Sequence, residues 1–174
     1  MTFHPYDSLS FAPAAGALIL TPCPGSKGVD ALTALAQLHA AGAEAVLTLM
    51  PVGELATNGV ANIGDLCAQV GMHWFHCPIE DDHAPEVEFQ HAWRQHRQAI
   101  HQLLDIGKKM AIHCRGGSGR TGLIAAQIFI ERGRPLPEAI SAVRSIRPQA
   151  LCLRVHQEYL ARLAREENPA DGVS

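Results

Sequence analysis

The sequence lacks several features that would point to a membrane, a secretory route or nucleic acid. No apolar run approaches the roughly 20 residues of a membrane-spanning helix, and residues 1–10 carry no basic region followed by an apolar stretch. Basic residues are not in excess, because 14 Lys and Arg stand against 17 Asp and Glu, for a formal net charge of -3. We therefore expect neither nucleic acid nor a membrane as a partner.

Cysteines are also few, since the chain has five, an odd number that is scattered along the sequence. A disulfide framework is not expected, and a reducing cytoplasm is the predicted location. No cluster has the spacing of a zinc site, so we expect no metal. The 174 residues are 47% hydrophobic and 18% charged, which indicates one globular domain over residues 1–174, with monomer as the default state. Its ordered core is expected over about residues 15–165.

Short apolar runs alternate with helical patterns along the chain. Strands are expected at residues 17–20, 45–50, 73–78 and 110–114, and helices at 29–41, 63–70, 85–106, 123–131, 136–145 and 153–164. The first dozen residues and the tail from Glu166 are expected to be irregular. This order predicts an α/β fold, with a mainly parallel central sheet, helices on both faces and a helical C-terminal third.

One loop combines several features that bind phosphate. Residues 113–122 read HCRGGSGRTG and lie between a predicted strand and a predicted helix. The glycines let backbone N–H groups turn inward, and the following helix directs its positive end at the same space. We predict a phosphate-binding loop that consists of Arg115, Gly116, Gly117, Ser118, Gly119 and Arg120.

The same loop offers a nucleophile. A cysteine at a helix N-terminus beside a cation has its pKa lowered from about 8.5, so Cys114 is predicted to be a thiolate that attacks phosphorus and forms a cysteinyl-phosphate. Arg120 follows after five residues and can hold two phosphate oxygens. The Thr121 hydroxyl is expected to hydrogen-bond the thiolate and to ease its departure in a second step.

The Cys-x5-Arg-Thr-Gly pattern resembles the protein tyrosine phosphatase superfamily, and within it the kinase-associated group of dual-specificity phosphatases. Shorter matches occur in the expected order, over about residues 18–163, at Pro24-Gly25, Gly53-Glu54-Leu55, Pro78-Ile79 and Gly116-Gly117. The resemblance implies a phosphatase fold and a cysteine-dependent protein phosphatase that needs no metal or cofactor. Its implied substrate is phosphotyrosine, with phosphoserine and phosphothreonine as further candidates.

The resemblance also implies roles outside the loop. The family's general acid is an aspartate in a Pro-Ile-x-Asp setting, four residues before a proline, which is Asp81 here, with Asp82 as its rival. A competing interpretation is that both aspartates cap the helix expected from Pro85. His113 is implied to support the thiolate by orienting the loop. Gln157 is a weaker candidate for positioning water.

Three alternatives stay open at this point. The chain could be a phosphatase for a small-molecule or lipid phosphate ester, a non-catalytic module that binds phosphorylated ligands, or a sulfurtransferase or arsenate reductase. The presence of both Cys114 and Arg120 disfavours the non-catalytic module, and their spacing disfavours the last two enzymes. The loop carries no lysine, which favours a phosphorylated protein over a phosphoinositide as the partner.

Overall fold

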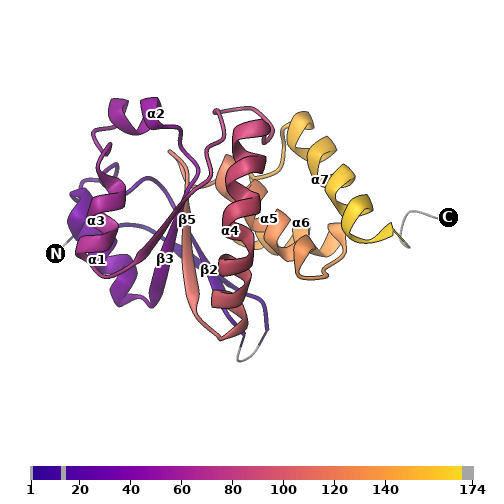
Figure 1. Cartoon of the computed structure of the whole chain (residues 1–174), viewed down its shortest axis with the longest axis horizontal. Helices are drawn as coiled ribbons and strands as arrows, with labels where there is room; N and C mark the ends of the chain where they lie inside the picture. Colours follow the sequence, from indigo (N-terminus) through magenta and orange to yellow (C-terminus); the bar gives the residue numbers. More distant parts are fainter. Residues whose placement is uncertain (1, 13–14, 170–174) are drawn as a thin grey trace.

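The computed structural model describes residues 2–12 and 15–169, and its centre is a five-stranded sheet (Figure 1). The strands are β1 (Asp7–Ser10), β2 (Ala17–Thr21), β3 (Ala43–Thr48), β4 (His73–His76) and β5 (Lys109–His113). Their order across the sheet is β1-β2-β5-β3-β4. Strands β2, β5, β3 and β4 are parallel to one another, and β1 pairs antiparallel with β2 at the edge. The predicted mainly parallel sheet is confirmed.

Helices cover both faces of this sheet, as predicted. Within the described ranges they are α1 (Ala31–Ala40), α2 (Val52–Thr57), α3 (Ile63–Gln69), α4 (Val87–Asp105), α5 (Gly119–Glu131), α6 (Leu136–Ile146) and α7 (Arg154–Glu167). Helices α1 and α3 lie on one face, whereas α4 and α5 lie on the other, with α6 and α7 beyond them (Figure 1). The C-terminal third is therefore helical.

Alternation along each strand divides the buried apolar residues between the two faces. In β2, Leu18 and Leu20 belong to the cluster that includes residues of α4, α5 and α7, while Ile19 belongs to the cluster beneath α1 and α3. In β5, Met110 and Ala111 divide in the same way. Because successive side chains of a strand point to opposite faces, a continuous apolar strand needs a helical layer on both sides.

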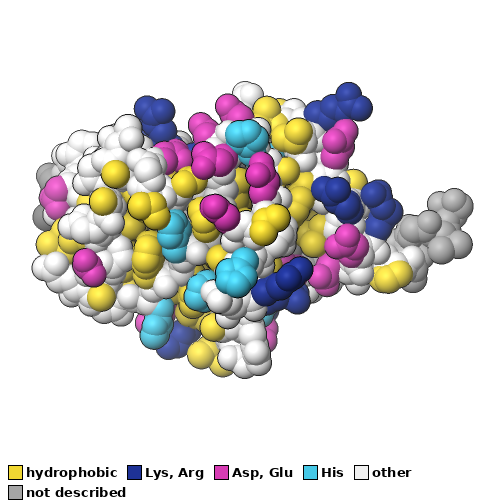
Figure 2. Space-filling model, turned by 45° about the horizontal axis from the view of Figure 1, so that its top comes forward, with side chains coloured by type: hydrophobic (Ala, Val, Ile, Leu, Met, Phe, Trp, Pro, Cys, Tyr) yellow, Lys and Arg dark blue, Asp and Glu magenta, His cyan; other side chains and the backbone are white. Residues whose placement is uncertain are grey.

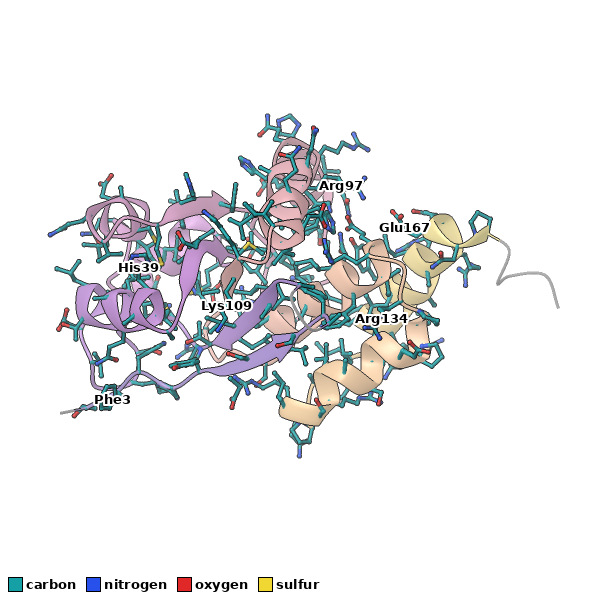
Figure 3. The ribbon with its side chains drawn as sticks, turned by 90° about the horizontal axis from the view of Figure 1, so that it is seen from below. Phe3, His39, Arg97, Lys109, Arg134 and Glu167 are labelled. Carbon is teal, nitrogen blue, oxygen red and sulfur yellow. The ribbon has the colours of Figure 1, made fainter. Side chains whose placement is uncertain are left out.

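Polar contacts of one buried carboxylate join the helices on the second face. Glu131 of α5 has a side chain that is 2% exposed, and it accepts hydrogen bonds from Trp93 and Arg97 of α4 and from Gln127 of α5. Arg97 also lies 3.9 Å from Glu167 of α7, and both residues are labelled in Figure 3. These contacts fix α4 against α5 and α7, so the loop before α4 has a stable base.

Two elements and several helix ends differ from the prediction. The first dozen residues contain β1, whose only buried residue is Leu9, so the alternation that marks a strand was too weak to detect. Helix α2 has six residues and one buried side chain, Leu55, so it too has little apolar periodicity. Helix α4 begins at Val87 rather than at Pro85, and α7 continues to Glu167, into the predicted tail. Residues 170–174 of that tail lie outside the described residues.

The parallel strands all end at one edge of the sheet, and the loops that follow them meet there. Residues 22–30 follow β2, α2 follows β3, residues 77–86 follow β4, and the 114–118 loop follows β5. Sites of open α/β sheets form at this carboxyl edge. No helix of residues 2–12 and 15–169 is long and apolar enough to cross a bilayer.

Candidate active site

The loop between β5 and α5 surrounds the sulfur of Cys114. The Gly117 amide donates a hydrogen bond to Cys114 Sγ over 3.3 Å, and the Thr121 hydroxyl donates one over 3.1 Å. Cys114 is 3% exposed, so the loop covers most of the surface of this residue. Donors to sulfur bind an anionic thiolate more strongly than a neutral thiol, so this arrangement suits a thiolate.

Gly117 allows this loop to sit directly on the end of β2. Its φ is +83°, and a Cβ at this position would lie 2.6 Å from the backbone nitrogen of Pro22. No other residue type fits both the dihedral angle and the space. The Cys23 amide also donates to the Arg115 carbonyl over 3.0 Å, so the loop after β2 and the phosphate-binding loop are joined through their backbones.

His113 stabilises the start of the loop through a hydrogen bond to the backbone of Cys114. Its Nδ1 lies 3.1 Å from the Cys114 carbonyl oxygen, which can only accept, so Nδ1 carries the proton. Burial lowers the pKa of His113 to about 4, so the ring is neutral near pH 7. Its Nε2 therefore accepts from the Thr48 hydroxyl over 2.7 Å, and Thr48 Oγ1 accepts from the Trp74 indole N–H over 2.8 Å. This chain of hydrogen bonds fixes the orientation of the ring beneath Cys114.

The buried neutral His113 should make stability depend on pH. Its pKa is about 4 when folded and 6.5 ordinarily, so between these values the unfolded chain binds more protons. The free energy of unfolding should therefore fall as the pH falls through this range, by about 3 kcal/mol for this residue. His4 and His156, whose pKa values are also lowered by burial, act in the same direction. Urea unfolding at several pH values measures this free energy for the wild type and for His113→Asn. An equal pH dependence in the two proteins would contradict the role assigned to His113.

Arg120, at the start of α5, forms an ion pair with Glu54 of α2. Its Nη1 and Nη2 each lie 2.7 Å from one carboxylate oxygen of Glu54, and Nη1 also donates to the Ile79 carbonyl over 2.8 Å. The residue is 2% exposed. A two-pronged ion pair of this kind fixes both the position and the plane of the guanidinium group. Glu54 was not predicted as a site residue, although an acidic residue shortly after a strand end was a usable signal.

Glu54→Gln should lower kcat/KM by about 10-fold, because Arg120 loses a charge-assisted hydrogen bond of about 1.5 kcal/mol that positions it. The matched control is Glu80→Gln, which removes an exposed carboxylate from the neighbouring loop. Steady-state kinetics with p-nitrophenyl phosphate compare the two variants. Equal kcat/KM values in both would mean that the ion pair does not position Arg120 for catalysis.

The loop between β4 and α4 brings Asp81 to the same place. Asp81 Oδ1 lies 3.5 Å from Arg120 Nη2, and the Asp81 side chain is 63% exposed. Its neighbour Asp82 has φ +62°, a left-handed conformation that Asp and Asn tolerate better than most residues. The interpretation of both aspartates as helix caps is wrong, because Glu86 occupies the N-cap position of α4 and no side chain caps that end.

His156 of α7 braces this loop, and sequence reasoning missed it. It is 1% exposed, and its Nε2–H donates to the carbonyl oxygen of His83 over 2.8 Å. Burial lowers the pKa of His156, which favours a neutral ring that donates from this nitrogen. The predicted candidate, Gln157, is exposed, and its amide donates to the Leu151 carbonyl over 2.9 Å. The structure does not bring Gln157 together with the other predicted residues.

Most of the predicted residues line one pocket of about 620 Å³. Its lining comes from four loops and the start of α5: Ser26 and Lys27 after β2, Asn58 after α2, Asp81 and Asp82 after β4, Cys114, Arg115, Gly116 and Ser118 after β5, and Gly119 and Arg120 in α5. His113 and Thr121 support the lining from behind, because both are fully buried. Ser26, Lys27 and Asn58 were not predicted. Within the described residues, no group of His, Cys, Asp and Glu is arranged to hold a metal ion.

Comparisons with known proteins agree with this geometry. A family model described as "Polymorphic toxin system, DSP-PTPase phosphatase" matches residues 25–134. Cyclin-dependent kinase inhibitor 3 of Sus scrofa is 30% identical over 145 residues, which cover 79% of this chain and 67% of that protein.

Solved structures share the fold. A kinase associated phosphatase with serine in place of its catalytic cysteine matches with a TM-score of 0.83 at 24% identity, and covers 98% of both chains. Tk-PTP in its active form matches with a TM-score of 0.66 at 30% identity, over 88% of this chain and 97% of that one. The predicted resemblance is confirmed: the chain belongs to the dual-specificity (DSP-PTPase) phosphatase family and is a cysteine-dependent protein phosphatase.

Proposed function

We propose that Cys114 is the nucleophile of this phosphatase, that Arg120 and the loop amides hold the reacting phosphate, and that Asp81 is the general acid. One observation carries the proposal: the sulfur of Cys114 receives two hydrogen bonds in the same pocket that Arg120 and Asp81 line. A nucleophile, an anion-binding cradle and a proton donor therefore face one space, as phosphoryl transfer requires.

In the first step, the Cys114 thiolate forms a bond to phosphorus while the bond from phosphorus to the ester oxygen breaks. The protonated Asp81 carboxyl donates its proton to that leaving oxygen, so the product departs as a neutral alcohol or phenol. Arg120 and the amides of the loop stabilise the negative charge on the remaining phosphate oxygens. The enzyme is left as a cysteinyl-phosphate, with Asp81 as a carboxylate.

In the second step, the Asp81 carboxylate takes a proton from a water molecule, and the oxygen of that water attacks phosphorus. The bond between sulfur and phosphorus breaks, and inorganic phosphate leaves. The returning negative charge on Cys114 is stabilised by the Thr121 hydroxyl and the Gly117 amide, which already contact the sulfur. The second step therefore returns Cys114 to the thiolate and Asp81 to the protonated carboxyl with which the first step began.

The proposed substrates are phosphorylated proteins, with phosphotyrosine first and phosphothreonine and phosphoserine as further candidates. The similarity to cyclin-dependent kinase inhibitor 3 over 145 residues supports a protein substrate. The cytoplasm is the proposed compartment, since all five cysteines are free thiols.

Phosphate release from matched phosphotyrosine and phosphothreonine peptides, and from phosphoinositide vesicles, tests the substrate class in the presence of EDTA. Faster turnover of a peptide than of the vesicles supports the proposal. Turnover of the vesicles alone would establish a lipid phosphatase instead.

His156→Ala should weaken the positioning of Asp81 without removing the nucleophile. Because His156 holds the His83 carbonyl, kcat for a phosphotyrosine peptide should fall by about 10-fold, which corresponds to about 1.4 kcal/mol. The fall should be smaller for p-nitrophenyl phosphate, whose leaving group needs little protonation. His156→Gln, which can donate to the same carbonyl, is expected to recover part of the difference. An equal loss for both substrates would indicate a general structural defect rather than a positioning role.

A further inference from the structure

We propose that Lys27 and Arg115 form a second anion-binding subsite at the mouth of the pocket, so that preferred substrates carry an anionic group beside the phosphorylated residue. The group is a carboxylate or a second phosphate on the same peptide. This inference rests on the proposed function of the Cys114 pocket and deepens it by naming a class of substrate. Both side chains line the pocket, and both are exposed at its rim.

The backbone fixes Lys27 beside the phosphate-binding loop. The turn that carries it is bracketed by Gly25 and Gly28, whose φ values are +96° and +77°. The Ser26 hydroxyl and amide both donate to the Cys23 carbonyl, over 2.6 and 3.1 Å. The Cys23 amide in turn donates to the Arg115 carbonyl. The turn is therefore anchored to the residue that carries the second cation.

The distribution of ion pairs separates these cations from Arg120. Arg120 is buried and balanced by Glu54, with Asp81 at 3.5 Å. Lys27 and Arg115, in contrast, form no ion pair with a residue of the described ranges. The unpaired positive charge of the pocket therefore lies at its mouth and not at its base. A reacting phosphate held by Arg120 and the loop amides leaves this charge available for another anion.

The acidic residues of the pocket come from a different loop. Asp81 and Asp82 follow β4, whereas Lys27 follows β2 and Arg115 follows β5. Figure 2, which turns the top of the molecule forward, shows acidic side chains gathered near the centre of the upper half, with basic groups on both sides of them. Because the two signs of charge sit on separate loops, the mouth can distinguish the direction in which an acidic peptide lies across it.

The test compares two phosphotyrosine peptides that differ only in having Asp or Asn next to the phosphorylated residue. The measured quantity is the ratio of kcat/KM for the Asp peptide to kcat/KM for the Asn peptide. Peptides with the Asp before or after the phosphorylated residue show in which direction the peptide lies across the mouth. A peptide with a second phosphorylated residue shows whether the preferred anion is a carboxylate or a phosphate. The wild type is expected to prefer the acidic peptide by about 5-fold, the upper range for a partly exposed ion pair, and less so at high salt.

Lys27→Ala and Arg115→Ala should each bring this ratio close to one, and Lys27→Glu should reverse it. Lys108→Ala is the matched control, because Lys108 is exposed beside the amino end of β5, away from the pocket, and the ratio should be unchanged. A ratio in Lys27→Ala and Arg115→Ala equal to that of the wild type would overturn the subsite. Lys27-dependent turnover that appears only with a bisphosphorylated inositol lipid would overturn the peptide assignment. Absence of turnover of every phosphopeptide by the wild type would instead mean that the proposed function itself fails.

Discussion

Replacement of Cys114 by serine is expected to lower kcat for p-nitrophenyl phosphate by about 10⁴-fold or more. A serine hydroxyl is a far weaker acid than a thiol, and the loop offers it no general base. The hydrogen bonds from Gly117 and Thr121 stabilise an anion at this position but do not remove a proton from serine. Release of p-nitrophenol at mildly acidic pH, with EDTA present, measures the effect.

The matched control for this substitution is Cys152→Ser, because Cys152 is the exposed free cysteine and lies outside the pocket. Its activity should equal that of the wild type. Substantial activity in Cys114→Ser would contradict the assignment of the nucleophile. A folded wild type that binds phosphopeptide without turning it over would contradict the enzyme and favour a binding module.

Asp81→Asn should lower kcat for a phosphotyrosine peptide by about 10²- to 10³-fold, the range of a lost general acid. The phenolic oxygen of tyrosine is a poor leaving group and needs a proton as it departs. p-Nitrophenolate is a better leaving group, so the loss with p-nitrophenyl phosphate should be smaller. Paired steady-state measurements on the two substrates separate loss of proton donation from loss of binding.

Asp82→Asn provides the control for this substitution. Asp82 adopts a left-handed backbone conformation that asparagine also tolerates, so the loop should keep its shape. Its kcat should stay within a few-fold of the wild type. If Asp82→Asn showed the larger loss and the stronger dependence on the leaving group, Asp82 would be the general acid.

The elements that carry strong local patterns were predictable from sequence. The apolar residues of β2 and β5 are consecutive, at 17–20 and 110–112, and the loop after β5 contains glycines, cysteine and arginine in one short segment. The carboxyl edge of a parallel sheet then brings that loop near the one that contains Asp81. Local pattern and topology together therefore predicted the four parallel strands of the sheet and the residues that line most of the pocket.

The contacts that brace the site were not predictable, because they join residues far apart in the sequence. Arg120 and Glu54 are 66 residues apart, and His156 and His83 are 73 apart. The choice of Gln157 rather than His156 shows a related limit. Neighbouring residues of a helix point about 100° apart, so an error of one residue moves a side chain from the buried face to the surface. Only the packing of α7 against the loop distinguishes them.

A covalent phosphate on Cys114 is the central intermediate of the proposed mechanism. The measurement is an acid quench during turnover of p-nitrophenyl phosphate, followed by digestion and mass spectrometry of the peptide that contains residue 114. Asp81→Asn is included because it should slow the second step and allow the intermediate to accumulate. The proposed mechanism predicts phosphate on Cys114 in this variant and none in Cys114→Ser. Measured turnover with no phosphocysteine in either the wild type or Asp81→Asn, or with the phosphate on another residue, would contradict it.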